Sequence, residues 1–188
     1  MEDRKGLDLH LIRASAGQLE EIRQAYIQVI DRTQHMKTYA RWIYGLHPTD
    51  EMIRSYLDSG AMYLLLDGTD IAGMMAVTMS QGDDYHEIAW ERQLPDTEVA
   101  VVHILAVMPE YQKQGLGRKM IEETLRLAKE NGKKAIRLDA LASNLPAHRL
   151  YESMGFSRRD RKHLYAENTG WTDFLFFERD VSPYSPQS

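Results

Sequence analysis

The stretch that decides the fold is VAVVHILAV, residues 99–107, in which one histidine interrupts an otherwise apolar run. A run of this kind, without polar alternation, is typical of a strand buried on both faces of a sheet. Pro109 follows it, and a short polar loop leads into residues 116–128, where apolar side chains recur at helical spacing. The stretch therefore predicts a central strand followed directly by an amphipathic helix.

A second strand and helix follow the first pair. Residues 135–141 are predicted to form a strand, and Asn144 is a predicted N-cap with Pro146 in the first turn of a helix that ends near Gly155. Strand, helix, strand and helix in succession indicate two parallel strands joined by a crossover helix.

The flanking segments extend this unit on both sides. We expect one α/β domain over residues 1–181, with a mixed, twisted sheet of about seven strands and helices on both faces, followed by a flexible tail at 182–188. The other expected elements are strands at 7–13, 62–66, 71–78, 156–165 and 171–178, and helices at 15–30 and 49–60.

Composition excludes several classes of protein. The chain has 188 residues and no cysteine, which rules out thiolate metal sites, iron–sulfur clusters and a thiol nucleophile. Its net charge of −5 argues against a surface built mainly for nucleic acid. We expect no membrane span, because no stretch reaches about 18 apolar residues, and we expect a cytoplasmic protein. We also predict no metal, because His86-Glu87 begins a zinc-binding pattern whose second histidine is missing.

A glycine-containing loop, Gln112–Lys119, lies between the central strand and its helix. Backbone N–H groups and the helix dipole at such a position favour an anion, and Gly115 and Gly117 let the backbone approach a ligand. A nucleotide-binding glycine fingerprint needs a small residue where Met120 stands. The glycines alone fit a phosphate-binding loop and an ordinary start of a helix equally well.

Two longer motifs narrow the choice. The first is Leu105-Ala106-Val107-x-Pro109-Glu110-Tyr111-Gln112-x-x-Gly115-x-Gly117, and the second is Asn144-x-x-Ala147-x-x-Leu150-Tyr151-x-x-x-Gly155-Phe156. Together, over residues 99–156, they resemble the GNAT superfamily of acyl-CoA-dependent N-acyltransferases. The resemblance implies transfer of an acetyl or short acyl group from acetyl-CoA to a primary amine, by direct attack through a tetrahedral intermediate. The sequence does not identify the amine, which could belong to a small molecule or a peptide.

The resemblance also implies roles for individual residues. Tyr151 stands at the position of the family's general acid; the alternative is a core aromatic beside Leu150 and Met154, and the two roles can coexist. The backbone of Leu105, Ala106 and Val107 would bind the pantetheine arm of acetyl-CoA, and Asn144 would contact that arm. The pyrophosphate would be held by the amides of Lys113, Gln114, Gly115, Leu116, Gly117 and Arg118.

The general base is harder to assign. Strand alternation places His103 on the same side as Leu105, and a histidine can accept the proton of an amine, but a lone histidine in a strand is more often structural. Glu98 is a second candidate. A further group of rivals consists of Asp83, Asp84, His86 and Glu87.

The acceptor side is expected to be aromatic. By the same resemblance, Tyr39 and Trp42, with Tyr44, would wall the acceptor site together with the loop at 165–171. Homodimers are common in the family, so a homodimer is one expected state. Two rival functions stay open: an acyl-CoA-binding sensor without catalysis, and a protein that binds the phosphates of a nucleotide.

Overall fold

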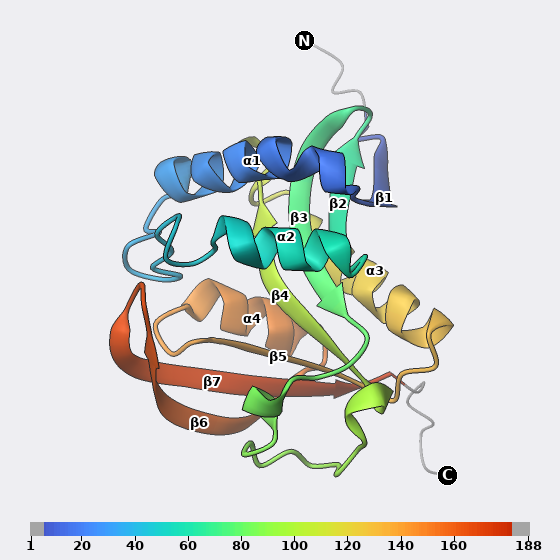
Figure 1. Ribbon diagram of the computed structural model, residues 1–188, viewed down its shortest axis with the longest axis vertical. Helices are drawn as coiled ribbons and strands as arrows, with labels where there is room; N and C mark the ends of the chain where they lie inside the picture. The colour runs from blue at the N-terminus through green and yellow to red at the C-terminus, as the bar shows by residue number, and fades with distance from the viewer. Residues whose placement is uncertain (1–5, 182–188) are drawn as a thin grey trace.

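The computed structural model describes residues 6–181, which form one seven-stranded sheet in the order β1-β2-β3-β4-β5-β7-β6 (Figure 1). The tail predicted at 182–188 lies outside the described residues. The strands are β1 (Leu9–Arg13), β2 (Met62–Asp67), β3 (Asp70–Thr78), β4 (Val99–Val107), β5 (Ala135–Leu141), β6 (Ser157–Ala166) and β7 (Gly170–Asp180). The helices are α1 (Leu19–Arg32), α2 (Asp50–Asp58), α3 (Leu116–Glu130) and α4 (Leu145–Ser153).

The predicted fold class and order of elements are confirmed. β4 and β5 are parallel with α3 as their crossover, and the other neighbouring strands are antiparallel. The Asp-Gly turn joins β2 to β3, with Gly68 at a φ of 59°. Most predicted boundaries agree with the structure to within two residues, because turn residues and helix caps mark them.

Helices cover both faces of the sheet. α1 and α2 pack on one face through Ile22, Tyr26 and Ile53. α3 and α4 pack on the other face through residues such as Met120 and Tyr151. In Figure 1, α1 and α2 lie together in front of the sheet. The site described below lies between these two layers.

The parallel strands β4 and β5 separate part-way along their length. They pair only from Val99↔Ala135 to Val101↔Arg137, whereas β5 stays paired with β7 as far as Leu141↔Phe174. Residues 102–107 of β4 therefore have no strand neighbour on the β5 side. The two strands diverge from this point on, and the opening between them lies at the carboxyl end of β4.

A β-bulge lies in β4 at the mouth of this opening. The register with β3 shifts so that Met74 faces Ala106 while Ala76 faces His103, and Ile104 has a φ of 44°. An extra residue in one strand reverses the alternation of side chains beyond it. The sequence prediction that His103 shares a side with Leu105 is therefore wrong: Leu105 packs with the α3 and α4 layer, while the His103 ring stacks on Tyr56 of α2.

Candidate functional site

A cavity of about 770 Å³ occupies the opening between β4 and β5. One part is lined by residues 105–107 of β4, the loop before α3 and the start of α4. The other part is lined by the connection between α1 and α2, by α2 itself, by His103 and by Asp139 of β5. The cavity thus passes from the predicted phosphate-binding loop toward the predicted acceptor walls.

The loop before α3 offers a run of unpaired backbone donors. Within residues 6–181, the N–H groups of residues 113–118 donate to no other group, and the first amide of the turn that does so is Lys119, which bonds the Gly115 carbonyl at 3.1 Å. Lys113 and Gly115 adopt φ values of 60° and 84°, which curl the loop into the helix. Consecutive free amides at the start of a 15-residue helix form a site for an anion.

The predicted pyrophosphate-binding residues divide into two groups. Lys113, Gly115, Leu116 and Gly117 line the cavity. The side chains of Gln114 and Arg118 point elsewhere: Gln114 Nε2 donates to the Glu110 carbonyl at 2.8 Å, and an Arg118 guanidinium nitrogen lies 3.3 Å from Ser153 Oγ. Their backbone amides nevertheless belong to the unpaired run.

The residues predicted to bind the cofactor arm are also at the cavity. Leu105, Ala106, Val107 and Asn144 all line it. Asn144 is in addition the N-cap of α4, where its Oδ1 accepts from the Ala147 amide at 3.4 Å. The positions of these residues agree with the sequence prediction, and their contacts with a cofactor stay a prediction.

Tyr151 is packed in the core and also lines the cavity, and its role as general acid stays a prediction. Its ring packs against Phe156 and Phe177, with centroid distances of 6.0 and 5.6 Å, and the residue is 8% exposed. It also lines the cavity, and its hydroxyl has no hydrogen-bond partner within residues 6–181. Burial, and then the negative charge of Asp139, raise the pKa of Tyr151 well above its usual value. The hydroxyl is therefore a protonated donor beside the cavity.

His103 lines the cavity in a neutral form. Its ring stacks on Tyr56 at a centroid distance of 5.4 Å, and its Nε2 lies 3.3 Å from Thr78 Oγ1. Burial, and then the neighbouring His47, lower the pKa of His103 to about 4. A group with this pKa is a weak base at neutral pH.

The other predicted bases lie away from the cavity. Glu98 precedes β4 at the end opposite the opening, and its carboxylate pairs with Lys134 at 2.8 Å. His86 pairs with Asp96 at 2.9 Å. None of Glu98, His86 and the acidic residues 83, 84 and 87 lines the cavity, because that end of β4 is still paired with β5 and the strands have not yet diverged.

The predicted acceptor walls are partly present. Tyr39 and Trp42 line the cavity, whereas Tyr44 lies outside it and donates its hydroxyl to Asp50 Oδ1 at 2.5 Å. Of the loop at 165–171, Ala166 and Asn168 contribute to the lining. Tyr165 and Trp171 lie outside the cavity and are 55% and 68% exposed.

Sequence reasoning missed Asp139. This aspartate lies on β5, lines the cavity, and accepts a 2.6 Å hydrogen bond from the Tyr85 hydroxyl at Oδ1. Burial raises the pKa of Asp139, and the hydrogen bond from Tyr85 partly opposes that rise. The available signal was a charged residue inside an apolar strand, AIRLDAL at 135–141. Such a residue must be paired or used for function.

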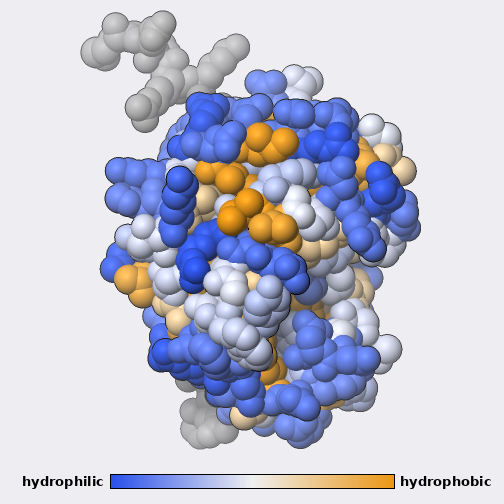
Figure 2. Space-filling view, turned by 60° about the vertical axis from the view of Figure 1, so that its left-hand side comes forward, coloured by the Kyte–Doolittle hydropathy of each residue, from blue (hydrophilic) through white to orange (hydrophobic). Residues whose placement is uncertain are grey.

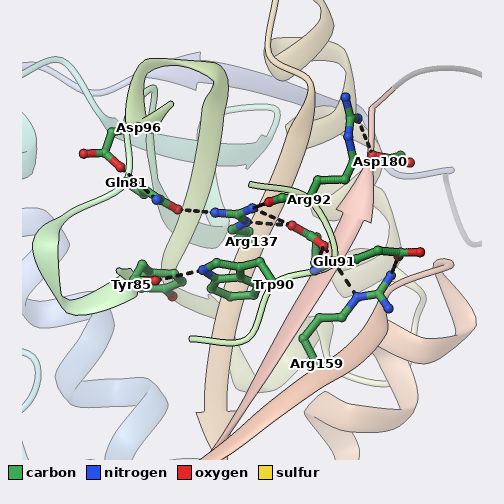
Figure 3. A network of polar contacts seen from close by, with 10 residues as sticks. Gln81, Tyr85, Trp90, Glu91, Arg92, Asp96, Arg137, Arg159 and Asp180 are labelled. Carbon is green, nitrogen blue, oxygen red and sulfur yellow. Dashed lines mark hydrogen bonds and ion pairs between the residues drawn. The ribbon is translucent and has the colours of Figure 1, made fainter. Parts of the chain in front are cut away.

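Tyr85 is held in place by a buried polar network (Figure 3). Its ring stacks on Trp90 at 5.4 Å, and Trp90 Nε1 donates to the Tyr85 carbonyl at 2.8 Å. The guanidinium of Arg137 lies 4.3 Å from the Trp90 ring centroid and bonds Glu178 at 2.8 Å and Gln81 at 2.6 Å. Paired and hydrogen-bonded, this buried arginine fixes the irregular segment between β3 and β4 that carries Tyr85.

The comparisons with known proteins agree with this geometry. The family model described as Acetyltransferase (GNAT) family matches residues 21–156. The chain belongs to the GNAT acetyltransferase family. The match covers α1 through α4, and therefore includes the loop, the bulge and the opening between β4 and β5.

Solved GNAT structures share the whole fold. An acetyltransferase of the family from Listeria monocytogenes superposes with a TM-score of 0.70 at 20% identity, covering 93% of this chain and 96% of that one. The Salmonella typhimurium protein yncA, solved with its cofactor acetyl-CoA, superposes with a TM-score of 0.67 at 15% identity, covering 96% and 98%.

Curated relatives match over shorter stretches. The ribosomal protein bS18 alanine N-acetyltransferase of Escherichia coli K12 is 34% identical over 84 residues, which are 44% of this chain and 57% of the relative. A mycothiol acetyltransferase of Catenulispora acidiphila is 28% identical over 116 residues, which are 62% of this chain and 34% of the relative. The chain thus spans little more than half of the first relatives.

Within residues 6–181, no helix combines the length and the apolar composition that a membrane crossing needs. The same part of the chain holds no group of three or more histidine or carboxylate side chains placed to bind a metal ion.

Proposed function

We propose that this protein transfers the acetyl group of acetyl-CoA to the nitrogen of a primary amine. The observation that carries the proposal is the run of unpaired amides at residues 113–118, which opens directly into the cavity between the diverging strands. A diphosphate bound by these amides directs the rest of the coenzyme along residues 105–107, with its thioester toward Asp139 and Tyr151.

We propose that Asp139 is the base that removes the proton of the incoming amine. An alkylamine is protonated at neutral pH and must lose a proton before it attacks the thioester carbonyl. Asp139 is a carboxylate in the cavity wall, and its raised pKa makes it a stronger base than an exposed aspartate. His103 is the rival, and burial lowers its pKa to about 4, which makes it a weaker base than an ordinary histidine.

We propose that the Tyr151 hydroxyl stabilises the sulfur of CoA as it leaves. The thiolate released from the tetrahedral intermediate has a pKa of about 8.5 when free, so a complete transfer from a buried phenol is uphill. A hydrogen bond from the hydroxyl to the sulfur nevertheless stabilises the developing charge as the C–S bond breaks. The proton that the attacking nitrogen loses as the amide forms then neutralises the thiolate. The chemistry requires no acyl-enzyme, and the chain has no cysteine to form one.

The comparisons support acetyl-CoA as the donor more strongly than they support any particular amine as the acceptor. One structural neighbour was solved with acetyl-CoA, and two curated relatives carry different names, ribosomal protein bS18 alanine N-acetyltransferase and mycothiol acetyltransferase. We therefore propose acetyl-CoA as the donor and a primary amine as the acceptor. A cytoplasmic location and a homodimer are part of the same proposal.

The test separates the enzyme from its alternatives. The full chain is titrated with acetyl-CoA by calorimetry and then assayed for release of free CoA thiol with a panel of primary amines. Binding together with amine-dependent release supports the proposal. Binding without release from any amine identifies an acyl-CoA sensor, and equal competition by ATP would indicate a general nucleotide-phosphate site.

A further inference from the structure

The part of the cavity away from the phosphate-binding loop has a simple charge pattern. Among the lining residues of the described chain, Asp139 is the one carboxylate, and Lys113 in the loop before α3 is the one lysine or arginine. Three histidines, His35, His47 and His103, also line the cavity, and burial lowers the pKa of His47 and His103. Asp139 therefore gives this part of the cavity a negative charge.

Aromatic side chains also line the cavity. Trp42 lies with its ring centroid 5.7 Å from His47 and 6.1 Å from Tyr26, and Tyr56 stacks on His103 at 5.4 Å. Burial, and then the negative charge of Asp139, raise the pKa of Tyr56 to about 12. A carboxylate among aromatic faces attracts a cation and an apolar body together.

Two hydrogen bonds hold the α1–α2 connection, here called the strap, against two neighbouring loops. Ser143 Oγ donates to the Tyr39 carbonyl at 2.9 Å, and Asn168 Nδ2 donates to the Arg41 carbonyl at 2.9 Å. These bonds join the α1–α2 connection to the β5–α4 loop and to the β6–β7 turn, from the two sides of the opening. Tyr39 and Asn168 line the cavity, so the strap forms part of its wall.

We propose that the acceptor is a small monoamine with an aromatic body and no carboxylate beside its amino group. Asp139 pairs with the ammonium, and the faces of Trp42 and Tyr56 contact the body. A carboxylate on the carbon next to the nitrogen would be brought close to Asp139, and like charges in a partly buried site repel strongly. This inference rests on the proposed function and specifies its acceptor.

One surface feature favours a polypeptide acceptor instead. Ile43 and Leu46 in the α1–α2 connection are 49% and 45% exposed, and Trp171 on the nearby hairpin is 68% exposed. Figure 2 shows apolar residues at the surface on the side of the molecule where these segments lie. A protein substrate would be expected to contact this rim, so the experiment includes it.

The experiment compares acceptors that differ in one group. Steady-state kcat/KM with saturating acetyl-CoA is measured for tryptamine, tryptophan and tryptophan methyl ester, and for phenethylamine against phenylalanine. We expect each amine to exceed its amino acid by about 100-fold or more, the scale of a few kcal/mol for an unfavourable buried charge. The methyl ester, which lacks the negative charge, recovers most of the difference.

Unreactive probes test binding apart from catalysis. N,N,N-trimethyltryptammonium carries the cation but cannot be acetylated, and indole-3-propionate carries an anion on a similar body. The cation should inhibit competitively with the amine, and the anion should not inhibit. Asp139→Asn should abolish this preference of the site for the cation, whatever it does to turnover.

Two tryptophan variants distinguish an acceptor bound inside the cavity from one that contacts the exposed apolar residues at its rim. Trp42→Ala should raise KM for tryptamine, whereas Trp171→Ala should leave it unchanged. A higher kcat/KM for tryptophan than for tryptamine, or for a peptide whose KM rises in Trp171→Ala, would overturn the inference while leaving the proposed function intact. Release of CoA with none of the amines or peptides would instead contradict the proposed function.

Discussion

The hydroxyl of Tyr85 donates a 2.6 Å hydrogen bond to Oδ1 of Asp139, and so joins the irregular segment between β3 and β4 to the cavity wall. The hydrogen bond favours the ionised form of Asp139, while burial disfavours it. The two effects together set the pH at which the carboxylate accepts a proton. A residue outside the cavity therefore adjusts a base inside it.

Removing this hydroxyl should move the pH dependence of the reaction. In Tyr85→Phe the pKa of Asp139 rises further, so the loss of kcat/KM on acidification should begin at a higher pH than in the native protein. We expect the acid limb to move by about one pH unit or more, since hydrogen bonds to charged groups contribute about 1.5–3 kcal/mol. The measurement is kcat/KM from pH 5 to 9, and Tyr165→Phe on the exposed hairpin is the control. An unmoved acid limb in Tyr85→Phe would show that Asp139 is not the base.

The loop conformation can be tested with a matched pair of glycines. Gly115 before α3 and Gly132 after it have φ values of 84° and 65°, and a Cβ at either would meet no atom within 4 Å. Gly115→Ala and Gly132→Ala should each cost about 1 kcal/mol of stability from left-handed strain. Only Gly115→Ala should weaken acetyl-CoA binding, because it alone alters the unpaired amides. Calorimetric Kd values that change equally in both variants would contradict the loop assignment.

Tyr151→Phe should separate catalysis from binding. The ring keeps its packing against Phe156 and Phe177, and the hydroxyl has no partner to lose within residues 6–181, so stability should change little. We expect kcat to fall about 100-fold, the lower range for a proton donor, with an unchanged Kd for acetyl-CoA. Pre-steady-state release of CoA reports the step. Normal turnover in this variant would remove Tyr151 from the mechanism.

The neutral state of His103 predicts a pH effect on stability. Its folded pKa of about 4 lies below the ordinary value of 6.5, so the unfolded chain binds more protons between these values. The contribution is fully present above pH 6.5 and is lost as pH falls toward 4, to a total of about 3 kcal/mol. Urea unfolding at pH 7 and pH 4.5 should show a smaller difference in His103→Gln than in the native protein. Equal differences would mean that His103 is not buried in its neutral form.

The sequence predicted the structure correctly at positions where a residue type favours a single local conformation. The apolar run at 99–107, the N-cap Asn144 and the Asp-Gly turn each predicted an element that the structure contains. The motifs also predicted the loop and Tyr151 at one site, because backbone donors and an aromatic side chain on successive elements meet at the end of β4.

The features that the sequence did not predict correctly depend on contacts between segments far apart in the sequence. The bulge at His103 and Ile104 arises from the register with β3, and periodicity within one strand does not reveal it. Asp139 acquires its role from Tyr85, which is 54 residues away in sequence. Glu98 was a reasonable prediction from its position next to the strand, but it lies at the wrong end once the direction of divergence is known.

The central claim is that backbone amides of one loop hold the coenzyme's diphosphate and so direct its thioester into the cavity. A crystal structure with bound CoA tests this most directly. We predict diphosphate oxygens within hydrogen-bonding distance of amide nitrogens of residues 113–118, and the thiol between β4 and β5 facing Tyr151. A coenzyme bound elsewhere, with those amides free of it, would contradict the account.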